Sequence, residues 1–322
     1  MSSKSEQDYL ESTIDEWNFY DLHDTKEFKN EKQYRRLCQK ILRKGELCQN
    51  DRTGVGTRFL SGQMMKFNLL SYQVPILTMK KVLWDKVITE LLFFISGKTN
   101  TKLLEEQNVK FWMPNTSREF LDKRNLHDYP EGCYGPTYGF LWRHCGAELD
   151  PETDTIKGDN QGIDQLQNLI NGIKNNPHDR RHILTAWIPQ YLDEIPLPPC
   201  HIMLLCTVSG CGKYIDASLI QRSGDMFLGV PFNMVSYAIL LHMIAFLTNK
   251  QARYFRHFIQ NAHIYLNHIE QTKLMISRTL YPAPTLSFKS TESIKTIDDF
   301  KLENIVIENY NHHPFIRADM AV

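Results

Sequence analysis

The segments LPPCH at residues 197–201 and QRSGDMFLGVPFN at residues 221–233 frame the part of the chain that decides the fold. Between them, the turn sequence SGCG at residues 209–212 predicts a β-hairpin with strands at 201–208 and 213–221. Residues 232–248, which follow, are apolar almost all round and predict a buried central helix. A cysteine, an arginine, a carboxylate and an amide therefore fall within one short span. Packing alone does not require these polar residues there.

Further elements are predicted on both sides of this span. Apolar residues at helical spacing predict helices at 33–43, 82–96 and 164–175, and short apolar runs predict strands at 184–188, 285–289 and 304–308. These elements follow one another without a regular βαβ repeat. We therefore expect an α+β fold, a single domain with a large mixed β-sheet covered by helices. Residues 1–30 are charge-rich and weakly periodic, and we expect them to form an N-terminal arm.

The composition excludes several classes of protein. The 322 residues contain 37 Lys and Arg and 37 Asp and Glu, so no net charge steers the chain towards nucleic acid or a membrane. We find no apolar run long enough to span a bilayer, and the N-terminus lacks the apolar region of a signal peptide. The seven cysteines are odd in number and form no C-x-x-C pair. We therefore expect reduced thiols in a cytoplasmic protein, with neither a disulfide framework nor a metal site.

Cys200 is the first candidate for chemistry. A buried structural thiol is the ordinary interpretation of a lone cysteine, but Arg222 and Ser223 lie on the paired strand. A cation close to a thiol lowers its pKa and activates it as a nucleophile. A dyad with His201 is disfavoured, because neighbouring residues on a strand point to opposite faces.

Four arginines are candidates for binding a phosphate group, because guanidinium groups match phosphate oxygens bidentately. They are Arg52 in a glycine-flanked loop, the pair Arg180 and Arg181, and Arg222. Solvated surface arginines are the alternative, and for the pair alone both interpretations are equally good. A P-loop is excluded because the chain has no matching G-K-[ST] motif.

Glu90 and Asn233 are polar residues at apolar positions. Glu90 lies in the helical segment VITELLFF at residues 87–94, where burial would raise the pKa of its carboxyl group and suit it to proton transfer. Asn233 stands at the head of the predicted central helix, where capping is the ordinary role of asparagine. Its amide also matches the donor and acceptor groups of uracil, whereas a carboxylate would suit cytosine better.

These segments, with YGPTYG at 134–139 and AHIYLNH at 262–268, resemble the thymidylate synthase and dCMP hydroxymethylase family from about residue 34 to residue 322. The resemblance implies a catalytic domain over 31–322 and a methyltransferase that converts dUMP to dTMP. Its co-substrate would be 5,10-methylenetetrahydrofolate, the donor of the one-carbon unit and the hydride, and dihydrofolate would be released. Met113, Leu141, Lys81 and Gln260-Asn261 depart from the family pattern, but none of them removes a catalytic group.

The resemblance also implies roles for individual residues. Cys200 would add to C6 of the uracil ring, Glu90 would transfer protons through ordered water, and Tyr138 would serve the removal of the C5 proton. The implied catalytic residues are Cys200, Glu90, Tyr138, Asp225 and Arg222. The implied dUMP-binding residues are Arg52, Arg180, Arg181, Gln221, Arg222, Ser223, Asn233, His263 and Tyr265. The implied folate-binding residues are Lys80, Trp112, Asp225, Leu228, Phe232, Ala321 and Val322, the last two in a closing C-terminal segment.

Two partners follow from the same resemblance. It implies a homodimer formed through the sheet, in which Arg180 and Arg181 reach the active site of the other subunit. RNA is implied as a secondary partner, because family members bind it. A hydroxymethylase is the first alternative, against which Asn233 and the intact C-terminus argue, and an RNA-binding homologue with weak catalysis is the second.

Overall fold

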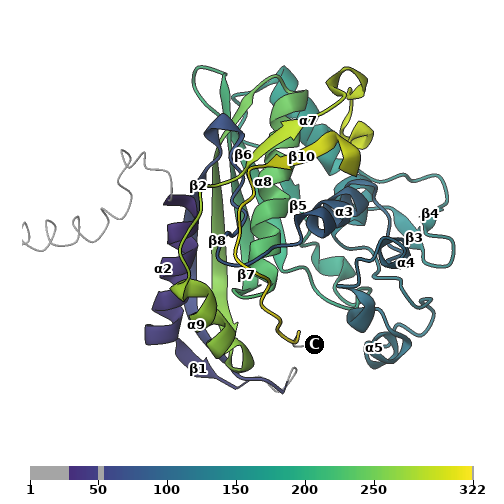
Figure 1. The fold of residues 1–322 in the computed structure, drawn as a ribbon. Helices are drawn as coiled ribbons and strands as arrows, with labels where there is room; N and C mark the ends of the chain where they lie inside the picture. Colours follow the sequence, from purple (N-terminus) through teal and green to yellow (C-terminus); the bar gives the residue numbers. More distant parts are fainter. Residues whose placement is uncertain (1–28, 50–53, 321–322) are drawn as a thin grey trace, which may run out of the picture.

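The computed structural model describes residues 29–49 and 54–320 (Figure 1). The predicted N-terminal arm, Arg52, Ala321 and Val322 therefore lie outside the described residues, apart from the last two residues of the arm.

A six-stranded sheet forms the centre of the fold, with the strand order β1-β2-β8-β7-β6-β5. Its strands are β1 Glu46–Cys48, β2 Thr57–Asn68, β5 Ile183–Thr185, β6 His201–Val208, β7 Tyr214–Asp225 and β8 Gln251–Tyr265. All neighbours are antiparallel except β7 and β8, which run parallel. A parallel pair needs a long crossover connection, and the helix α8 (Gly229–Leu247) provides it. The predicted large mixed sheet is confirmed.

The remaining elements are helices and two small hairpins. The helices are α2 Lys29–Lys44, α3 Trp84–Ile95, α4 Lys102–Glu105, α5 Arg118–Lys123, α6 Tyr138–His144, α7 Gln165–Asn175 and α9 Ile269–Ser277. The hairpins pair β3 (Glu148–Asp150) with β4 (Thr155–Lys157), and β9 (Thr285–Phe288) with β10 (Ile305–Glu308). The predicted helices at 33–43, 82–96 and 164–175 correspond to α2, α3 and α7. The strand predicted at 184–188 is shorter and begins at Ile183.

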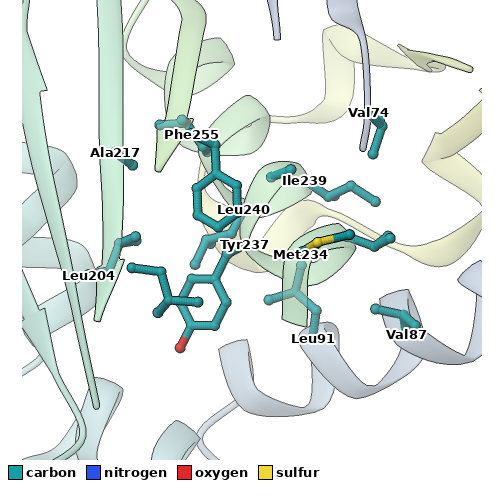
Figure 2. Packing of buried hydrophobic residues seen from close by; sticks show 14 of the residues in the cluster. Val74, Val87, Leu91, Leu204, Ala217, Met234, Tyr237, Ile239, Leu240 and Phe255 are labelled. Carbon is teal, nitrogen blue, oxygen red and sulfur yellow. The ribbon is translucent and has the colours of Figure 1, made fainter. Parts of the chain in front are cut away.

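The helix α8 is the centre of the hydrophobic core, as predicted. Figure 2 shows Leu240 and Tyr237 of α8 between Leu204 and Phe255 of the sheet on one side and Leu91 of α3 on the other. Within the described residues, α8 has the length and apolar composition of a membrane span, which the sequence interpretation did not find. Most of its residues are buried inside the protein, so its apolar surface is accounted for by the core.

The start of α8 differs from the prediction. The helix begins at Gly229, with Pro231 in its first turn, where a proline is tolerated because its missing N–H would have no partner in the helix. Asn233 therefore lies inside the helix and does not cap it. The alternative interpretation of Asn233, as the cap of this helix, is therefore excluded.

The two faces of the sheet differ. Ile215, Ala217 and Leu219 of β7 are buried in the core, whereas Ile220 on the other face is only partly buried. On this outer face the register aligns Met203, Ile220, Phe258 and Met64 in one row across β6, β7, β8 and β2. Met64 is 41% exposed, and the other three are partly buried. One row of apolar side chains is therefore left without full cover.

Candidate active site

Cys200 immediately precedes β6 in a segment that two other residues fix. The backbone N–H of Arg222 donates to the carbonyl oxygen of Cys200 at 2.8 Å. The Arg222 guanidinium donates to the carbonyl oxygens of Pro199 at 2.8 Å and of Pro198 at 2.7 Å. The backbone N–H of Cys200 in turn donates to the Tyr138 hydroxyl at 2.8 Å. The predicted proximity of Arg222 to Cys200 is confirmed, and the prolines and Arg222 together fix the approach to the thiol.

Tyr138 is the first residue of α6 and has a strained backbone, with φ at +29°. Tyrosines rarely adopt such a φ, and residues held there cluster at functional sites. Its ring stacks on that of His201, with centroids 4.1 Å apart. The following residue is glycine for a steric reason, because a Cβ atom on Gly139 would lie 2.4 Å from the carbonyl oxygen of Phe94. Close packing of α6 on α3 thus places the Tyr138 hydroxyl at Cys200.

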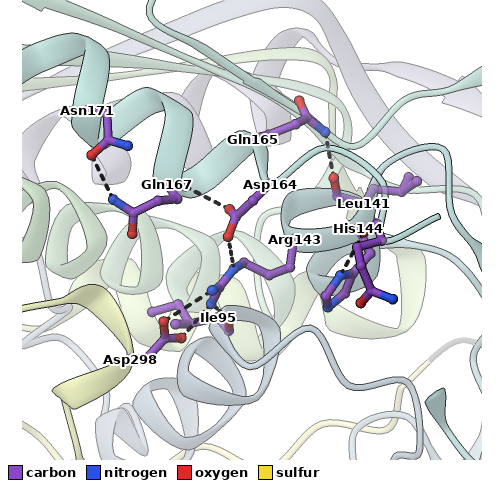
Figure 3. Close-up of polar contacts among 10 residues, drawn as sticks. Ile95, Leu141, Arg143, His144, Asp164, Gln165, Gln167, Asn171 and Asp298 are labelled. Atoms are coloured by element: carbon purple, nitrogen blue, oxygen red, sulfur yellow. Dashed lines mark hydrogen bonds and ion pairs between the residues drawn. The ribbon is translucent and has the colours of Figure 1, made fainter. Parts of the chain in front are cut away.

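Arg143, at the other end of α6, fixes this helix from three sides (Figure 3). Its guanidinium donates to Asp164 at 3.0 Å, to the carbonyl oxygen of Ile95 at 2.6 Å, and to both carboxylate oxygens of Asp298. These partners lie before α7, at the end of α3 and in the C-terminal part of the chain. The position of Tyr138 therefore depends on segments that are far apart in the sequence.

Glu90 points from α3 towards the same group of rings. It accepts a hydrogen bond from the indole N–H of Trp112 at 2.8 Å, and the Trp112 ring lies 5.8 Å from that of Tyr138. Burial raises the pKa of the Glu90 carboxyl to about 7, against which the Trp112 hydrogen bond acts only in part. The predicted rise of the Glu90 pKa is confirmed. Sequence reasoning missed the contact with Trp112, because 21 residues lie between the two in the chain.

His201 contacts Tyr237 and Tyr138 and is not placed to act as a base for Cys200. Its Nδ1 lies 2.7 Å from the Tyr237 hydroxyl, and its ring packs against Tyr138. Burial lowers the pKa of His201 to about 3, so the ring is neutral at physiological pH. This agrees with the sequence prediction that Cys200 and His201 form no dyad.

Gln221 and Asn233 meet beneath the end of β7. The Gln221 amide nitrogen donates to Asn233 Oδ1 at 3.1 Å and to the carbonyl oxygen of Ser223 at 2.8 Å. Gln221 Oε1 lies 2.7 Å from Nε2 of His257, which β8 contributes. Sequence reasoning found Gln221 and Asn233 but missed His257, because a single histidine in an otherwise ordinary strand gives no signal.

The parallel register of β7 and β8 brings together two further pairs of polar residues. Asp225 pairs with His263, and Ser223 pairs with Asn261. The His263 ring also contacts that of Tyr265, with centroids 5.0 Å apart. His263 and Tyr265, which the resemblance implies for dUMP binding, therefore lie side by side on β8.

Asp225 lies between the sheet and the C-terminal segment. Burial alone would raise the pKa of its carboxyl, but the interactions with His268 and His263 hold that pKa below its usual value, so the group is ionised. Nδ1 of His268 lies 3.9 Å from Asp225 Oδ1, and its Nε2 lies 2.7 Å from the carbonyl oxygen of Asp319. His268 therefore links Asp225 to the last residues that the structure describes.

Lys80 lies close to this carboxylate but is buried. Its amine donates to the carbonyl oxygen of Phe227 and lies 3.8 Å from the centre of the Phe227 ring. Burial lowers the pKa of Lys80 to about 8, although the charge of Asp225 acts in the opposite direction. The predicted contact of Lys80 with folate stays a prediction.

Comparison with known proteins identifies the family. A sequence model of thymidylate synthase matches residues 32–322. Human thymidylate synthase is 47% identical over 292 residues, which are 91% of each chain. The Saccharomyces cerevisiae enzyme is 45% identical over 302 residues, 91% of this chain and 98% of the yeast protein. The chain belongs to the thymidylate synthase family.

A longer relative matches equally well over part of its length. The bifunctional dihydrofolate reductase-thymidylate synthase of Plasmodium berghei is 46% identical over 304 residues. This match covers 94% of the present chain but 50% of that relative, so the chain spans about half the length of the bifunctional protein.

Arg180 and Arg181 lie far from Cys200 within one chain. They precede β5, and the next residue, His182, accepts a hydrogen bond from the backbone N–H of Cys206. Cys206 lies six positions along the chain from Cys200, and six steps of a strand span roughly 20 Å. The Arg181 side chain is 84% exposed and pairs with Asp179 at 2.8 Å. The two arginines therefore do not join the Cys200 site of their own chain.

No group of three or more metal-ligating side chains occurs in residues 29–49 and 54–320. Arg222 and Tyr138 contact the Cys200 segment, and the Glu90 carboxyl joins the same group of rings through Trp112. The site can therefore fix a nucleophile, accept and donate protons near neutral pH, and bind an anionic ligand.

Proposed function

We propose that Cys200 is the nucleophile with which this chain carries out thymidylate synthesis. Membership of the family gives the reaction, in which dUMP and 5,10-methylenetetrahydrofolate yield dTMP and dihydrofolate. The observation that carries the assignment is the fixation of the Cys200 backbone between Arg222 and Tyr138. The thiolate adds to C6 of the uracil ring, and the electron pair of the C5–C6 double bond moves towards O4. The cysteine leaves again when the methyl group is complete.

Asn233 and Gln221 select the base in this proposal. Asn233 Oδ1 accepts from Gln221, so the Asn233 N–H₂ group points elsewhere and is suited to donate to uracil O4. Arg222, Ser223, His263 and Tyr265 bind the phosphate and ribose groups. Two of the five N–H donors of Arg222 make the bonds to Pro198 and Pro199 that fix the Cys200 segment.

Glu90 and Tyr138 handle the protons. A carboxyl group with a pKa of about 7 both donates and accepts protons near neutral pH, which suits proton transfer to O4 and from C5. The Tyr138 hydroxyl lies at the backbone of Cys200 and is the nearer of the two groups to the nucleophile. We assign proton transfer at O4 to Glu90, and we assign to the Tyr138 hydroxyl a place in the water network through which the C5 proton is removed.

The residues around Asp225 fit a folate. When bound, the co-substrate supplies the one-carbon unit and the hydride. Asp225 is an ionised carboxylate, which suits the N–H groups of a pterin ring. Trp112, Leu228 and Phe232 pack against the core while remaining partly exposed, and they suit the apolar parts of the same molecule. We further propose that Ala321 and Val322 close the site, with the preceding segment held through the bond between His268 and Asp319.

The chain acts as a homodimer in this proposal. The row of Met203, Ile220, Phe258 and Met64 on the outer face of the sheet is apolar and incompletely covered. A twofold dimer through this face buries the row and brings the exposed Arg180 and Arg181 of one subunit to the site of the other. Together with Arg52 and Arg222, they bind the dUMP phosphate.

Replacement of the nucleophile tests the proposal. Cys200→Ser should lose dTMP and dihydrofolate formation, because a serine hydroxyl is not ionised near neutral pH. Binding of dUMP, measured by calorimetric titration, should persist. Cys211→Ser is the matched control, because Cys211 is an exposed cysteine in the hairpin turn, and it should keep full activity. Near-normal turnover by Cys200→Ser would remove the nucleophile from the mechanism.

A further inference from the structure

His257 is a buried histidine that the mechanism above does not use. Its side chain is fully buried, on the face of β8 that also presents Phe255 and Ile259 to the core. An apolar residue would fill such a position at lower cost, since an imidazole loses its hydration there. Burial lowers the pKa of His257 to about 3, so the ring is neutral and one of its nitrogens carries the only proton.

A backbone carbonyl determines which atom donates and which accepts in each of the hydrogen bonds that connect His257, Gln221 and Asn233. The Ser223 carbonyl can only accept, so the Gln221 atom 2.8 Å from it is the amide nitrogen. Gln221 Oε1 then faces His257, and the His257 Nε2 at 2.7 Å must be the N–H donor. The Asn233 atom at 3.1 Å from the Gln221 nitrogen must in turn be the oxygen.

The other nitrogen of the ring is consistent with this tautomer. Nδ1 of His257 is buried and has no hydrogen-bond partner among the described residues. A nitrogen that carried a proton there would leave a buried N–H unsatisfied, which costs more than a buried lone pair of a neutral ring. The proton of His257 therefore stays on Nε2, facing Gln221.

We propose that His257 is a positioning residue that makes the site select uracil over cytosine. Cytosine would require the Asn233 amide turned over, with its oxygen towards the amino group of the base. The Asn233 N–H₂ would then meet the N–H₂ of Gln221, and Gln221 cannot turn over because its oxygen accepts from His257. His257 thus holds the amide orientation that presents a donor to O4. This inference rests on the proposed role of Asn233 in binding the base.

Three variants test the inference, with dUMP and dCMP as the probes. His257→Phe keeps a ring of similar volume but removes the N–H donor, and His257→Gln restores an amide donor. The dissociation constants of both nucleotides are measured by titration calorimetry on the full-length dimer. We expect the preference of His257→Phe for dUMP over dCMP to fall about tenfold, as for the loss of one buried hydrogen bond. His257→Gln should stay within about threefold of the wild type.

His242→Phe is the matched control. His242 is also buried, and burial lowers the pKa of its ring to about 4, but it contacts the backbone carbonyl oxygen of Gln73, outside the proposed site. This variant should lose stability in urea without a change of nucleotide preference. If His257→Phe does not fold, His257→Leu replaces it.

The outcomes separate the inference from the function on which it rests. An unchanged preference in folded His257→Phe, beside a wild type that prefers dUMP, overturns the role of His257 and leaves Asn233 as the reader of the base. A wild type without preference for dUMP removes the proposed role of Asn233, and with it this inference. Equal losses of preference in the His242 and His257 variants would show a general effect of lost packing and would also overturn it.

Discussion

At the scale of single residues, Glu90 is a carboxyl group whose burial disfavours its ionised form and so lowers the stability of the fold when it is charged. Burial raises the pKa of its carboxyl to about 7, well above the ordinary value of 4.5. Within residues 29–49 and 54–320, the indole N–H of Trp112 donates the one hydrogen bond that compensates for this burial. The folded protein therefore binds a proton at Glu90 over a pH range in which the unfolded chain has released it. This difference makes the site testable without any substrate.

The first prediction concerns the pH dependence of stability. Because the folded-state pKa of Glu90 is raised, its contribution to stability is fully present below about pH 4.5 and is lost as the pH rises to about 7. The loss over this range amounts to about 3 kcal/mol of unfolding free energy. Glu90→Gln lacks this titration, so its stability relative to the wild type should rise between pH 5 and 7 and then level off.

Urea unfolding at pH 5, 6, 7 and 8 measures this difference, at one protein concentration because the stability of the proposed dimer would depend on that concentration. Glu119→Gln is the matched control for the loss of one carboxyl group, since Glu119 is exposed on α5. A difference between Glu90→Gln and the wild type that is constant from pH 5 to 8 would contradict a raised pKa at Glu90.

At the scale of elements, the packing of α6 on α3 determines where Tyr138 lies. Gly139 allows the two helices to approach, because a Cβ atom there would lie 2.4 Å from a backbone oxygen of α3. Arg143 then fixes the far end of α6 to Asp164 and to the last turn of α3. The strained φ of Tyr138 is held by these contacts on both sides and not by the local sequence.

The second prediction is that Gly139→Ala separates α6 from α3. The backbone oxygen of Phe94 cannot move aside as a flexible side chain would, so we expect a loss of about 1–3 kcal/mol of unfolding free energy. Turnover should fall as well, because Tyr138 moves away from Cys200. Gly210→Ala is the control, since a Cβ atom there meets nothing within 4 Å, and it should change stability by less than about 0.5 kcal/mol. Unchanged stability and turnover in Gly139→Ala would show that the helices adjust without cost.

The sequence predicted the elements whose apolar residues recur with a clear period. The helices at α2, α3 and α7 and the hairpin of β6 and β7 carry such patterns. The strand β2 was not predicted, and β8 was not predicted along most of its length, because their polar residues, among them His257, interrupt the alternation. The start of α8 was missed because Gly229 and Pro231 resemble a loop when read locally.

The site was predictable to the extent that its residues are close in the chain or part of a recognisable motif. Cys200, Arg222 and Asn233 fall within one hairpin and the helix after it. The contact of Glu90 with Trp112 and that of Gln221 with His257 arise from tertiary packing, and spacing in the sequence gives no sign of them. The position of Arg181, remote from Cys200, depends on the register of β5 on β6.

At the scale of the whole molecule, one chain does not bring together at one site the arginines that are proposed to contact the phosphate of dUMP. Arg181 lies beside the end of β6 that is remote from Cys200, with its side chain 84% exposed. The outer face of the sheet between them carries the apolar row of Met203, Ile220, Phe258 and Met64. In a twofold dimer, residues at opposite ends of this face approach one another across the interface.

The last prediction is that two inactive variants restore activity when their subunits exchange. Cys200→Ser lacks the nucleophile but keeps Arg181, whereas Arg181→Glu keeps the nucleophile and repels the phosphate. A heterodimer of the two contains one site with both groups intact and one with neither. Random exchange of equal amounts makes half of the dimers mixed, so activity should reach about a quarter of the wild-type value.

The control mixes Cys200→Ser with Glu90→Gln. Glu90 contacts Trp112, which packs on Tyr138, and Tyr138 contacts Cys200, all within one chain. Each site of that heterodimer therefore keeps one defect, and mixing should restore nothing beyond the residual activity of the parents. Heterodimers are confirmed by native mass spectrometry of tagged subunits, and dTMP formation is measured on the same samples. If confirmed heterodimers of Cys200→Ser and Arg181→Glu stay inactive, Arg181 does not complete the partner's site, and the exposed arginine has a different role.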